Sequence, residues 1–391
     1  MAIEKLDHYG ISCEQGFLCA YDAGKVALPE YWSDGARAAM QLPQWLPTGE
    51  VRRHLSGSPP DPATLQVDAL SEAQARMAMV HYSFMVQAWV WGEETPSARL
   101  PAALAVPTVA LADRLGQQPL LPYSGYVLDN WTLIDRDAPV SLDNIAMIQN
   151  FLSGQDEAWF VLIHVAIEAR AGEALALMKP IVEAIEDHDA DSAARYLESM
   201  AAVWRDINQI FDRMPERCDP YVYFRRVRPY IHGWKDNPGL PDGVVYEGVD
   251  RYAGHGQVFR GQTGSQSSIV PTMDALLGVG HAGDPLRTYL DELHHYRPPG
   301  HRQFIEDVRA SSRLREFAKS QRHTALINAY NANVQGVADF RAKHLEYAAT
   351  YINKQGKTAN GNHTDVGTGG TPFMRYLKKH RNETRANLLV A

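Results

Sequence analysis

Residues 156–187, DEAWFVLIHVAIEARAGEALALMKPIVEAIED, constrain the fold of this chain more than any other stretch. Their first half is apolar on nearly all sides of a helix, so a helix here needs neighbours all around it. Elsewhere apolar residues recur at spacings of three and four, and the alternation typical of strands is nearly absent. The sequence therefore predicts an all-α protein with this stretch as a core helix.

Helical spacing also marks segments on either side of this core helix, and Gly154 has the character of a helix stop. We expect helices in residues 70–92, 142–154, 272–280, 285–296, 298–311 and 323–355. Two segments differ, because residues 1–60 are irregular and residues 233–268 are rich in Gly, Pro, Asp and Gln. A connection as long as the second one is more often functional than not.

The composition argues against several classes of partner. The 391 residues suffice for two domains, and a net charge of −8 without a long basic run argues against nucleic acid or an anionic membrane as the partner. Cys13, Cys19 and Cys218 form no CxxC pair, so neither a disulfide framework nor a cysteine zinc site is indicated. No signal segment or membrane-spanning run is evident. We expect a cytoplasmic protein, and a monomer is compatible with the sequence.

Common nucleotide and metal motifs are absent from the sequence. QGKTANG contains Gly-Lys-Thr, but Tyr351 stands where a phosphate loop has its first glycine. No strand is expected before GTGGT, which argues against a dinucleotide fold, and neither HExxH nor Gly-x-Ser-x-Gly occurs. The acidic run EDHDAD is compatible with a divalent ion, but Asp191 or Ser192 fits better as the cap of the next helix.

The segment DFRAKHLEYAATYI carries a single histidine, His344, on an apolar helix face. Such a histidine is usually a hydrogen-bonded core residue. The neighbouring turns of the same face carry flat or small residues that suit packing against a porphyrin: Val337, Phe340, Ala348 and Tyr351. A helical protein with inward histidines and no motif for phosphate, flavin or nicotinamide suggests haem, which needs one axial imidazole. The residues alone leave both interpretations of His344 open.

Five separated blocks of sequence resemble the indoleamine 2,3-dioxygenase family in order and spacing. They are LPYSGYVLDNW, RPYIHGWKDNPGLPDGVVYEG, GSQSSIVPTMDALLG, YRPPGHRQFIEDV and GTGGTPFMRYLKK, which together run from about Leu120 to nearly the end of the chain. The resemblance implies an all-α fold with a small N-terminal helical domain, residues 1–150, and a large helical domain, residues 151–391, that binds haem b. The large domain would contain the long loop 233–268 and a mobile GTGG loop at residues 367–371.

The resemblance also implies an activity. Family members insert both atoms of O2 across the indole C2–C3 bond of L-tryptophan or a close indoleamine, which gives N-formylkynurenine in the kynurenine pathway. FRAKHLEYA matches the family segment with the proximal haem ligand, so His344 is implied as the iron ligand. Arg228 matches the arginine near the substrate carboxylate, for which a guanidinium can donate two parallel hydrogen bonds. Arg225 and Arg226 are better interpreted as surface charges.

Other matched positions imply the walls of the pocket. Tyr223, Phe160 and Tyr123 would lie against the substrate, although each also suits a plain core position. Thr263 and Gly264 match the loop over the haem, where small residues let the backbone approach and a hydroxyl can reach substrate or oxygen.

Three further matches lie outside these walls. Thr368, in the GTGG loop, would contact the substrate when the loop closes, because its glycines supply hinge freedom. Asp274 and Arg341 match an ion pair near the proximal side, where structural support is the better interpretation.

Two positions depart from the animal enzymes. His164 stands where those enzymes have a serine facing the iron, and His232 replaces a small residue near Arg228. We expect His164 to hydrogen-bond the indole N–H or the oxygen and to narrow the substrate range, with a core histidine as the alternative. His232 puts the shape of the substrate end in question.

Two functions of different classes are compatible with the sequence. The first is a haem dioxygenase that opens the indole ring, with haem b as cofactor and O2 as co-substrate. The second is a haem-binding protein of the same fold that senses gas or oxidises another indole without ring opening. Turnover of L-tryptophan separates them.

Overall fold

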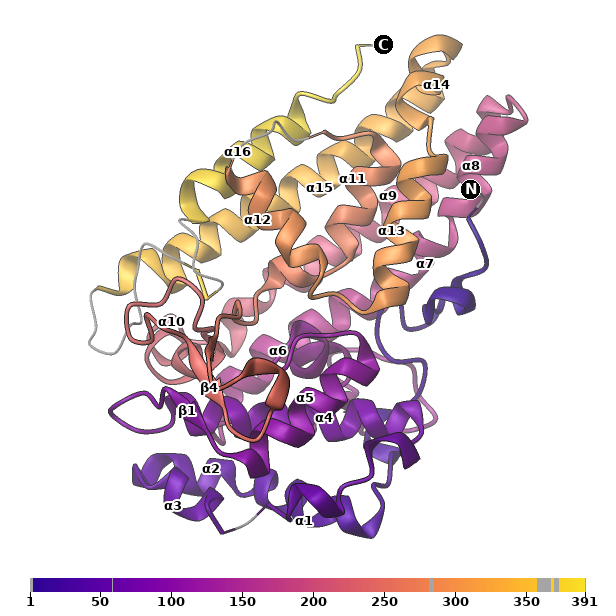
Figure 1. Cartoon of the computed structure of the whole chain (residues 1–391). Coiled ribbons are helices and arrows are strands. Elements are labelled where there is room, and N and C mark those ends of the chain that lie inside the picture. Colours follow the sequence, from indigo (N-terminus) through magenta and orange to yellow (C-terminus); the bar gives the residue numbers. More distant parts are fainter. Residues whose placement is uncertain (1–2, 58, 281–284, 357–366, 369–372, 391) are drawn as a thin grey trace.

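The structure is a computed structural model that describes residues 3–57, 59–280, 285–356, 367–368 and 373–390. Helices dominate the described residues and the strands are short, so the predicted all-α class is confirmed. Figure 1 shows helices α1 to α5 gathered at one end of the molecule and a larger bundle with α9, α11, α13, α15 and α16 at the other, with α6 between them.

The smaller group is formed by the first third of the chain. Its helices are α1 (Glu30–Met40), α2 (Leu42–Trp45), α3 (Val51–Leu55), α4 (Glu72–Trp91) and α5 (Ala102–Leu115). At the start of α4 the Ser71 hydroxyl accepts the backbone N–H of Gln74, and the Gln74 side chain accepts the backbone N–H of Ser71. The expected start near Leu70 is therefore confirmed, and α4 is buried on nearly all sides.

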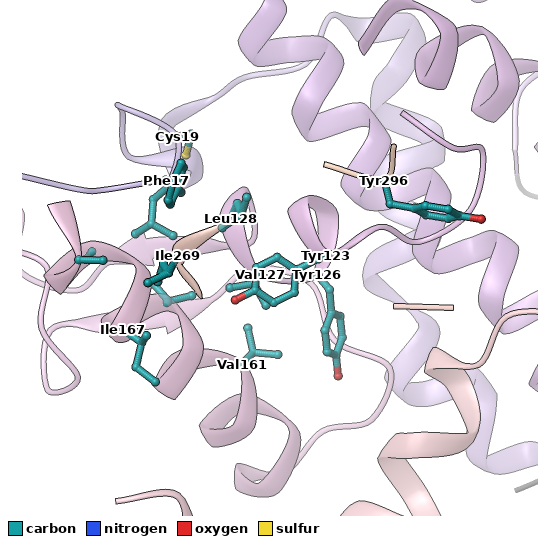
Figure 2. Close-up of a cluster of buried hydrophobic side chains, with 14 of the residues drawn as sticks. Phe17, Cys19, Tyr123, Tyr126, Val127, Leu128, Val161, Ile167, Ile269 and Tyr296 are labelled. Carbon is teal, nitrogen blue, oxygen red and sulfur yellow. The ribbon is translucent and has the colours of Figure 1, made fainter. Parts of the chain in front are cut away.

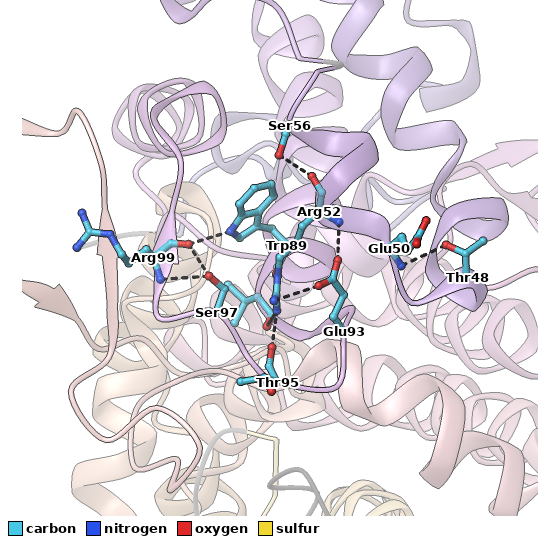
Figure 3. A network of polar contacts seen from close by, with 10 residues as sticks. Thr48, Glu50, Arg52, Ser56, Trp89, Glu93, Thr95, Ser97 and Arg99 are labelled. Atoms are coloured by element: carbon cyan, nitrogen blue, oxygen red, sulfur yellow. Dashed lines mark hydrogen bonds and ion pairs between the residues drawn. The ribbon is translucent and has the colours of Figure 1, made fainter.

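Arg52 fastens α3 to the end of α4 (Figure 3). Its Nε donates to the carbonyl of Trp89 at 2.8 Å, and its NH2 donates to the carbonyl of Thr95 at 2.6 Å. The carboxylate of Glu93 accepts the backbone N–H of Arg52 at 2.9 Å. The last carbonyls of a helix have no partner within it, so these bonds both complete α4 and order the region before it.

The larger bundle follows from residue 155 onward. Its helices are α6 (Gln155–Arg170), α7 (Gly172–Ala176), α8 (Met178–Glu186), α9 (Ala190–Asp212), α10 (Pro220–Val222), α11 (Ile269–Leu277), α12 (Pro285–His294), α13 (Pro299–Ser311), α14 (Leu314–Gln321), α15 (Thr324–Tyr351) and α16 (Phe373–Arg385). The long α15 packs along α9 and α16. Within the described parts of the chain, no helix combines the length and the hydropathy needed to cross a membrane.

Two small sheets are formed by segments that connect the helices. Their strands are β1 (Arg99–Leu100), β2 (Trp131–Leu133), β3 (Ile145–Met147), β4 (Val244–Tyr246) and β5 (Gly256–Gln257). β4, from the long loop 233–268, pairs in parallel with β1 and antiparallel with β5, so this loop is attached to the smaller group.

The helix predicted over residues 142–154 is wrong. β3 pairs antiparallel with β2 there, and the carboxylate of Glu157 accepts the backbone N–H groups of Phe151 and Leu152 at 3.0 Å. Those N–H groups are no longer available to a helix, so the chain stays extended. Gly154, at φ 148°, precedes the start of α6 and does not end an earlier helix.

The acidic run before α9 forms the expected turn, but a different residue caps the helix. The Asp189 carboxylate accepts the backbone N–H of Ser192 at 2.9 Å, so Asp189 is the cap in place of Asp191 or Ser192. The helix begins two or three residues earlier than a cap at Asp191 or Ser192 would give, because the Asp189 carboxylate already reaches the open N–H groups.

Two π-helical turns bring unusual side-chain directions into the bundle. They cover Ser124–Leu128 and Tyr223–Val227, and the second is followed by a short 3-10 turn, Arg228–Ile231. Such turns are rare and often occur at functional sites. Figure 2 shows Tyr123 and Tyr126, at the first π turn, beside Val161 of α6. The buried cluster there joins α6 to the segment before β2.

Candidate active site

Two adjoining cavities lie among α6, α9, α15, α16 and the loop before α11. The smaller has a volume of about 160 Å³ and the larger about 1050 Å³. The residues that line both cavities are His164, Phe211, Gly264, Ser265, Leu290, His344, Leu377 and His380. Pockets for small molecules commonly have volumes of about 300–1,000 Å³, so the larger cavity has room for a large planar group.

His344 lies on the α15 wall of both cavities. Burial, with further contributions from His164 and the positive charge of Arg341, lowers the pKa of its imidazole to about 4. The ring is therefore neutral near pH 7 and keeps a nitrogen lone pair for a metal. Of the residues expected to flank it, Phe340 lines the larger cavity, whereas Val337 is fully buried.

His164 lies on the α6 wall of the same cavities. Its Nδ1 is 2.7 Å from the backbone carbonyl of Phe160. A carbonyl only accepts hydrogen bonds, so Nδ1 carries the proton and Nε2 is the acceptor of the neutral ring. Burial lowers the pKa of His164 from its ordinary value, which keeps the ring neutral. His164 therefore offers an acceptor to a ligand, as a serine at this position also does.

Aromatic rings form the end of the smaller cavity. The ring centroids of Phe160 and Tyr223 are 4.7 Å apart, and those of Tyr223 and Tyr351 are 5.8 Å apart. All three residues line this cavity. They provide flat apolar surfaces of the kind that an indole ring packs against.

Small residues form a second side of the smaller cavity. Thr263, Gly264, Gly367 and Thr368 line it. The Thr368 hydroxyl donates to the carbonyl of Gln262 at 2.5 Å, so the two segments lie against each other. The rest of the GTGGT segment, residues 369–371, lies outside the described residues, and its expected closure stays a prediction.

Arg228 and His232 do not line either cavity. Arg228 is fully buried with its guanidinium 5.5 Å from the ring centroid of Phe224. Burial lowers its pKa to about 10, partly offset by Tyr223, so it remains a cation near pH 7. The backbone carbonyl of His232 accepts hydrogen bonds from Gln87 Nε2 at 3.1 Å and Trp91 Nε1 at 2.9 Å. The guanidinium of Arg228 thus packs on Phe224 outside both cavities, and the backbone of His232 is held against α4.

Asp274 and Arg341 form an ion pair that joins α11 to α15, and both line the larger cavity. Arg341 also donates to the hydroxyl of Thr384 on α16. The pair thus connects three helices next to His344, which is the arrangement that structural support requires.

Tyr123 is part of a buried cluster that the sequence did not indicate. Its hydroxyl donates to Glu168 Oε1 at 2.8 Å, and the Ser267 hydroxyl donates to the same oxygen at 2.7 Å. Glu168 and Tyr123 line the larger cavity together with Arg297. Burial raises the pKa of Glu168 to about 7. The signal available in the sequence was a carboxylate within the apolar part of a helix, one turn after His164.

Phe211 of α9 and three residues of α16 were also missed. Tyr376, Leu377 and His380 line the smaller cavity from α16. Single apolar residues and one histidine on a polar helix give no pattern from which their direction can be inferred.

The chain is similar to known proteins along nearly its whole length. A family model described as indoleamine 2,3-dioxygenase matches residues 5–387. Indoleamine 2,3-dioxygenase 1 of Rattus norvegicus is 31% identical over 98% of this chain and 96% of its own length. Indoleamine 2,3-dioxygenase 2 of Homo sapiens is 31% identical over 98% of the chain, and the indoleamine 2,3-dioxygenase of Saccharomyces cerevisiae is 31% identical over 80%. The chain therefore belongs to the indoleamine 2,3-dioxygenase family and is a dioxygenase of the oxidoreductase class.

Proposed function

We propose that this protein uses haem b to insert both atoms of O2 across the C2–C3 bond of L-tryptophan or a close indoleamine, giving N-formylkynurenine. The observation that carries this proposal is the placement of two neutral imidazoles, His344 on α15 and His164 on α6, on different walls of the same two cavities. One imidazole suits an iron ligand and the other suits a partner for the substrate.

The residues present fit haem. The neutral His344 is a suitable axial ligand, and the larger cavity beside it has a volume of about 1050 Å³. Phe340 contributes a flat apolar surface to this cavity, and the Asp274–Arg341 pair fixes the helix that carries His344. When bound, the haem supplies the oxygen chemistry and the bond breaking, while the protein supplies orientation and electrostatics.

His164 would orient the indole ring. Because Nδ1 is occupied by the Phe160 carbonyl, Nε2 is left to accept the indole N–H. This hydrogen bond fixes the rotation of the ring about its long axis. It also favours substrates with a free N–H over N-alkylated ones, because the buried acceptor would otherwise be left without a donor.

Phe160 and Tyr223 would pack against the faces of the indole ring, and Arg228 would bind the carboxylate of the substrate. The rings of Phe160 and Tyr223 line the smaller cavity, whereas the guanidinium of Arg228 packs on Phe224 and lines neither cavity. We therefore propose that Arg228 reaches the carboxylate by turning from Phe224 toward the cavity when the substrate enters. A buried cation next to an apolar cavity gains most when a carboxylate arrives, since little water competes for either charge.

Thr263 and Thr368 would close the remaining side. Both line the smaller cavity, and the hydrogen bond from Thr368 to the Gln262 carbonyl holds the segment near Gly367 against the loop that carries Thr263. Closure at this point excludes water from the reacting bond.

Turnover of the haem-loaded protein tests this function. The protein is reduced without oxygen, then given O2 and L-tryptophan, and formylkynurenine absorbance is followed. With ¹⁸O₂ the product should carry two labelled oxygen atoms by mass spectrometry. Stable haem binding without any formylkynurenine would contradict the proposal and favour a haem protein that does not open the ring.

A further inference from the structure

Glu168 is a buried carboxyl group on the wall of the larger cavity. It is 1% exposed and lies on α6 one turn after His164. Both hydroxyls that reach its carboxyl, from Tyr123 and Ser267, donate to Oε1. Within the described residues, Oε2 is buried without a hydrogen-bond partner. A buried polar atom without a partner costs about 1–3 kcal/mol, so its retention calls for a ligand.

The proton of this carboxyl belongs on Oε2. An sp² oxygen accepts two hydrogen bonds, and Oε1 already accepts two. Burial raises the pKa of Glu168 to about 7, so much of the group is a neutral acid near that pH. In that form Oε2 is an O–H donor on the wall of the larger cavity, which His164 also lines and of which the haem would fill only a part.

His164 supplies the complementary acceptor. Its Nε2 has a lone pair because Nδ1 donates to the Phe160 carbonyl. Residues four apart on a helix have Cβ atoms about 5–6 Å apart, so their side chains can converge on one group. The pair therefore offers one donor and one acceptor to a ligand with an acceptor and a donor on neighbouring atoms. A formamide has this pattern in the rotamer that places its N–H and its C=O on the same side of the C–N bond.

We propose that Glu168 and His164 together bind the formamide group of the ring-opened product, Glu168 Oε2 donating to the formyl oxygen and His164 Nε2 accepting the formamide N–H. This inference rests on the proposed function. In the reaction, the indole nitrogen becomes the formamide nitrogen and C2 becomes the formyl carbon. The N–H on His164 is therefore retained, and a new carbonyl acceptor arises next to it.

Glu168 would thus bind the product and not the substrate, because the indole ring has no acceptor at C2. His164 would bind both the substrate and the product, whereas Glu168 would bind only the product. Holding the formyl group also keeps the open chain from turning back over the pocket.

The groups around Glu168 do not change charge in the pH range in which Glu168 titrates. Tyr123 has a pKa raised well above 10 by burial and by Glu168, and Arg297, with its pKa lowered by burial to about 10, stays a cation near pH 7. Burial lowers the pKa of His164 from its ordinary value, so its imidazole is neutral near pH 7. Ser267 does not titrate. Only Glu168, within this group, changes charge near pH 7.

Equilibrium binding tests the inference without turnover. Calorimetry on the ferric, haem-loaded protein would compare added N-formylkynurenine with kynurenine, which lacks the formyl group. The wild type should prefer the formyl compound. Glu168→Gln keeps a donor and should retain the preference, whereas Glu168→Leu should lose about three- to tenfold of it, the value of one neutral hydrogen bond.

The pH dependence of this binding preference provides a second, independent measurement. In the wild type the preference should fall as the pH rises from about one unit below the pKa of Glu168 to about one unit above it, because a carboxylate cannot donate. In Glu168→Gln it should not change over that range. This comparison needs only the wild type and the isosteric variant, so it stands even where Glu168→Leu fails to fold.

Glu157 offers a matched control. It is also a buried carboxyl of α6 with a pKa raised to about 7, but its oxygens accept backbone N–H groups and it lines neither cavity. Glu157→Gln should therefore leave the formyl preference and its pH dependence as in the wild type.

The inference is overturned where Glu168→Leu keeps the full preference, or where the wild type and Glu168→Gln show the same pH dependence. If a protein with either result still produces formylkynurenine, this inference is overturned and the proposed function stands. Binding of added N-formylkynurenine through Glu168 by a protein that makes none would contradict the proposed function and support the site.

Discussion

Arg341 and Asp274 meet through two parallel hydrogen bonds, 3.0 Å from NH1 to Oδ1 and 2.6 Å from NH2 to Oδ2. Their side chains are 8% and 13% exposed, so little water screens the pair. Arg341 lies three residues before His344 on α15. The pair therefore fixes the rotation of the helix that carries the proposed iron ligand.

Asp274→Ala should destabilise the fold and weaken haem retention together. Removing one partner of a buried pair leaves an uncompensated charge and costs about 3–5 kcal/mol. Denaturant unfolding and haem transfer to apomyoglobin measure the two effects. The control is Asp113→Ala, which breaks the exposed pair with Arg251 and should cost about 1 kcal/mol or less. Equal effects of the two variants would contradict a supporting role for Asp274.

His344→Ala should abolish stable haem binding or give a spectrum without a proximal imidazole. The reason is that His344 is the proposed axial ligand on the wall of both cavities. Haem content and the ferrous–CO spectrum are the measurements. His81→Ala serves as the comparison, since that histidine is buried against Gln149 and lines neither cavity. A wild-type ferrous–CO spectrum in His344→Ala would exclude this ligand.

Arg228→Ala should lower kcat/KM for L-tryptophan by roughly ten- to a hundredfold, since a charge-assisted hydrogen bond is worth about 1.5–3 kcal/mol. Haem content should not change. Turnover of tryptamine, which has no carboxylate, should be affected far less. Arg225→Ala is the control, because Arg225 is exposed, as the sequence indicated. Equal losses for both substrates would point to general damage and not to carboxylate binding.

His164→Ser should slow L-tryptophan turnover and improve the relative use of 1-methyl-tryptophan. The methyl compound has no N–H to donate and places a methyl group against the imidazole, and a shorter side chain relieves the second problem. The loss on L-tryptophan should not exceed about 10²–10⁴, the range for one positioned acid–base group. Steady-state kinetics on both substrates decide, and unchanged values for both would show that His164 has no part in binding.

The free energy of unfolding should fall as the pH rises toward 7, in part because of Glu157. Its pKa is raised mainly by burial from 4.5 to about 7 in the folded state. Below 4.5 both states hold the proton; above it the unfolded state loses the proton first, so the contribution is lost as pH rises through the folded pKa, by about 3 kcal/mol. Denaturant unfolding across this range should show a smaller slope for Glu157→Gln than for the wild type.

The helical class and most helices of the larger bundle were predictable because the apolar periodicity there is long and regular. The segment 142–154 was not, because a carboxylate from the next helix takes its N–H groups, which is a tertiary effect. His344, Phe160, Tyr223, Thr263 and Thr368 lie together on the smaller cavity, and the roles that the resemblance implies for them stay predictions. The position of Arg228 against Phe224, outside both cavities, was not predictable, because the direction of a side chain after a π turn cannot be inferred from residue spacing.

Glu168 was missed for another reason. One carboxylate within an apolar stretch of helix gives no motif, and its role depends on hydroxyls from two distant segments that the fold brings to Oε1. The proposed domain boundary near residue 150 stays a prediction, although Figure 1 shows the smaller helical group and the larger bundle on either side of α6.

The π turn at Tyr223–Val227 makes the substrate end of the pocket tolerant of one change in chain length. A π turn holds one residue more than an α turn before the chain returns to the same face. Removal of one residue within it would therefore give an α turn, and Arg228 would keep nearly the same direction relative to Tyr223. In an ordinary α turn, the same deletion would rotate the following chain by about 100° and would separate the aromatic half of this end of the pocket from its cationic half.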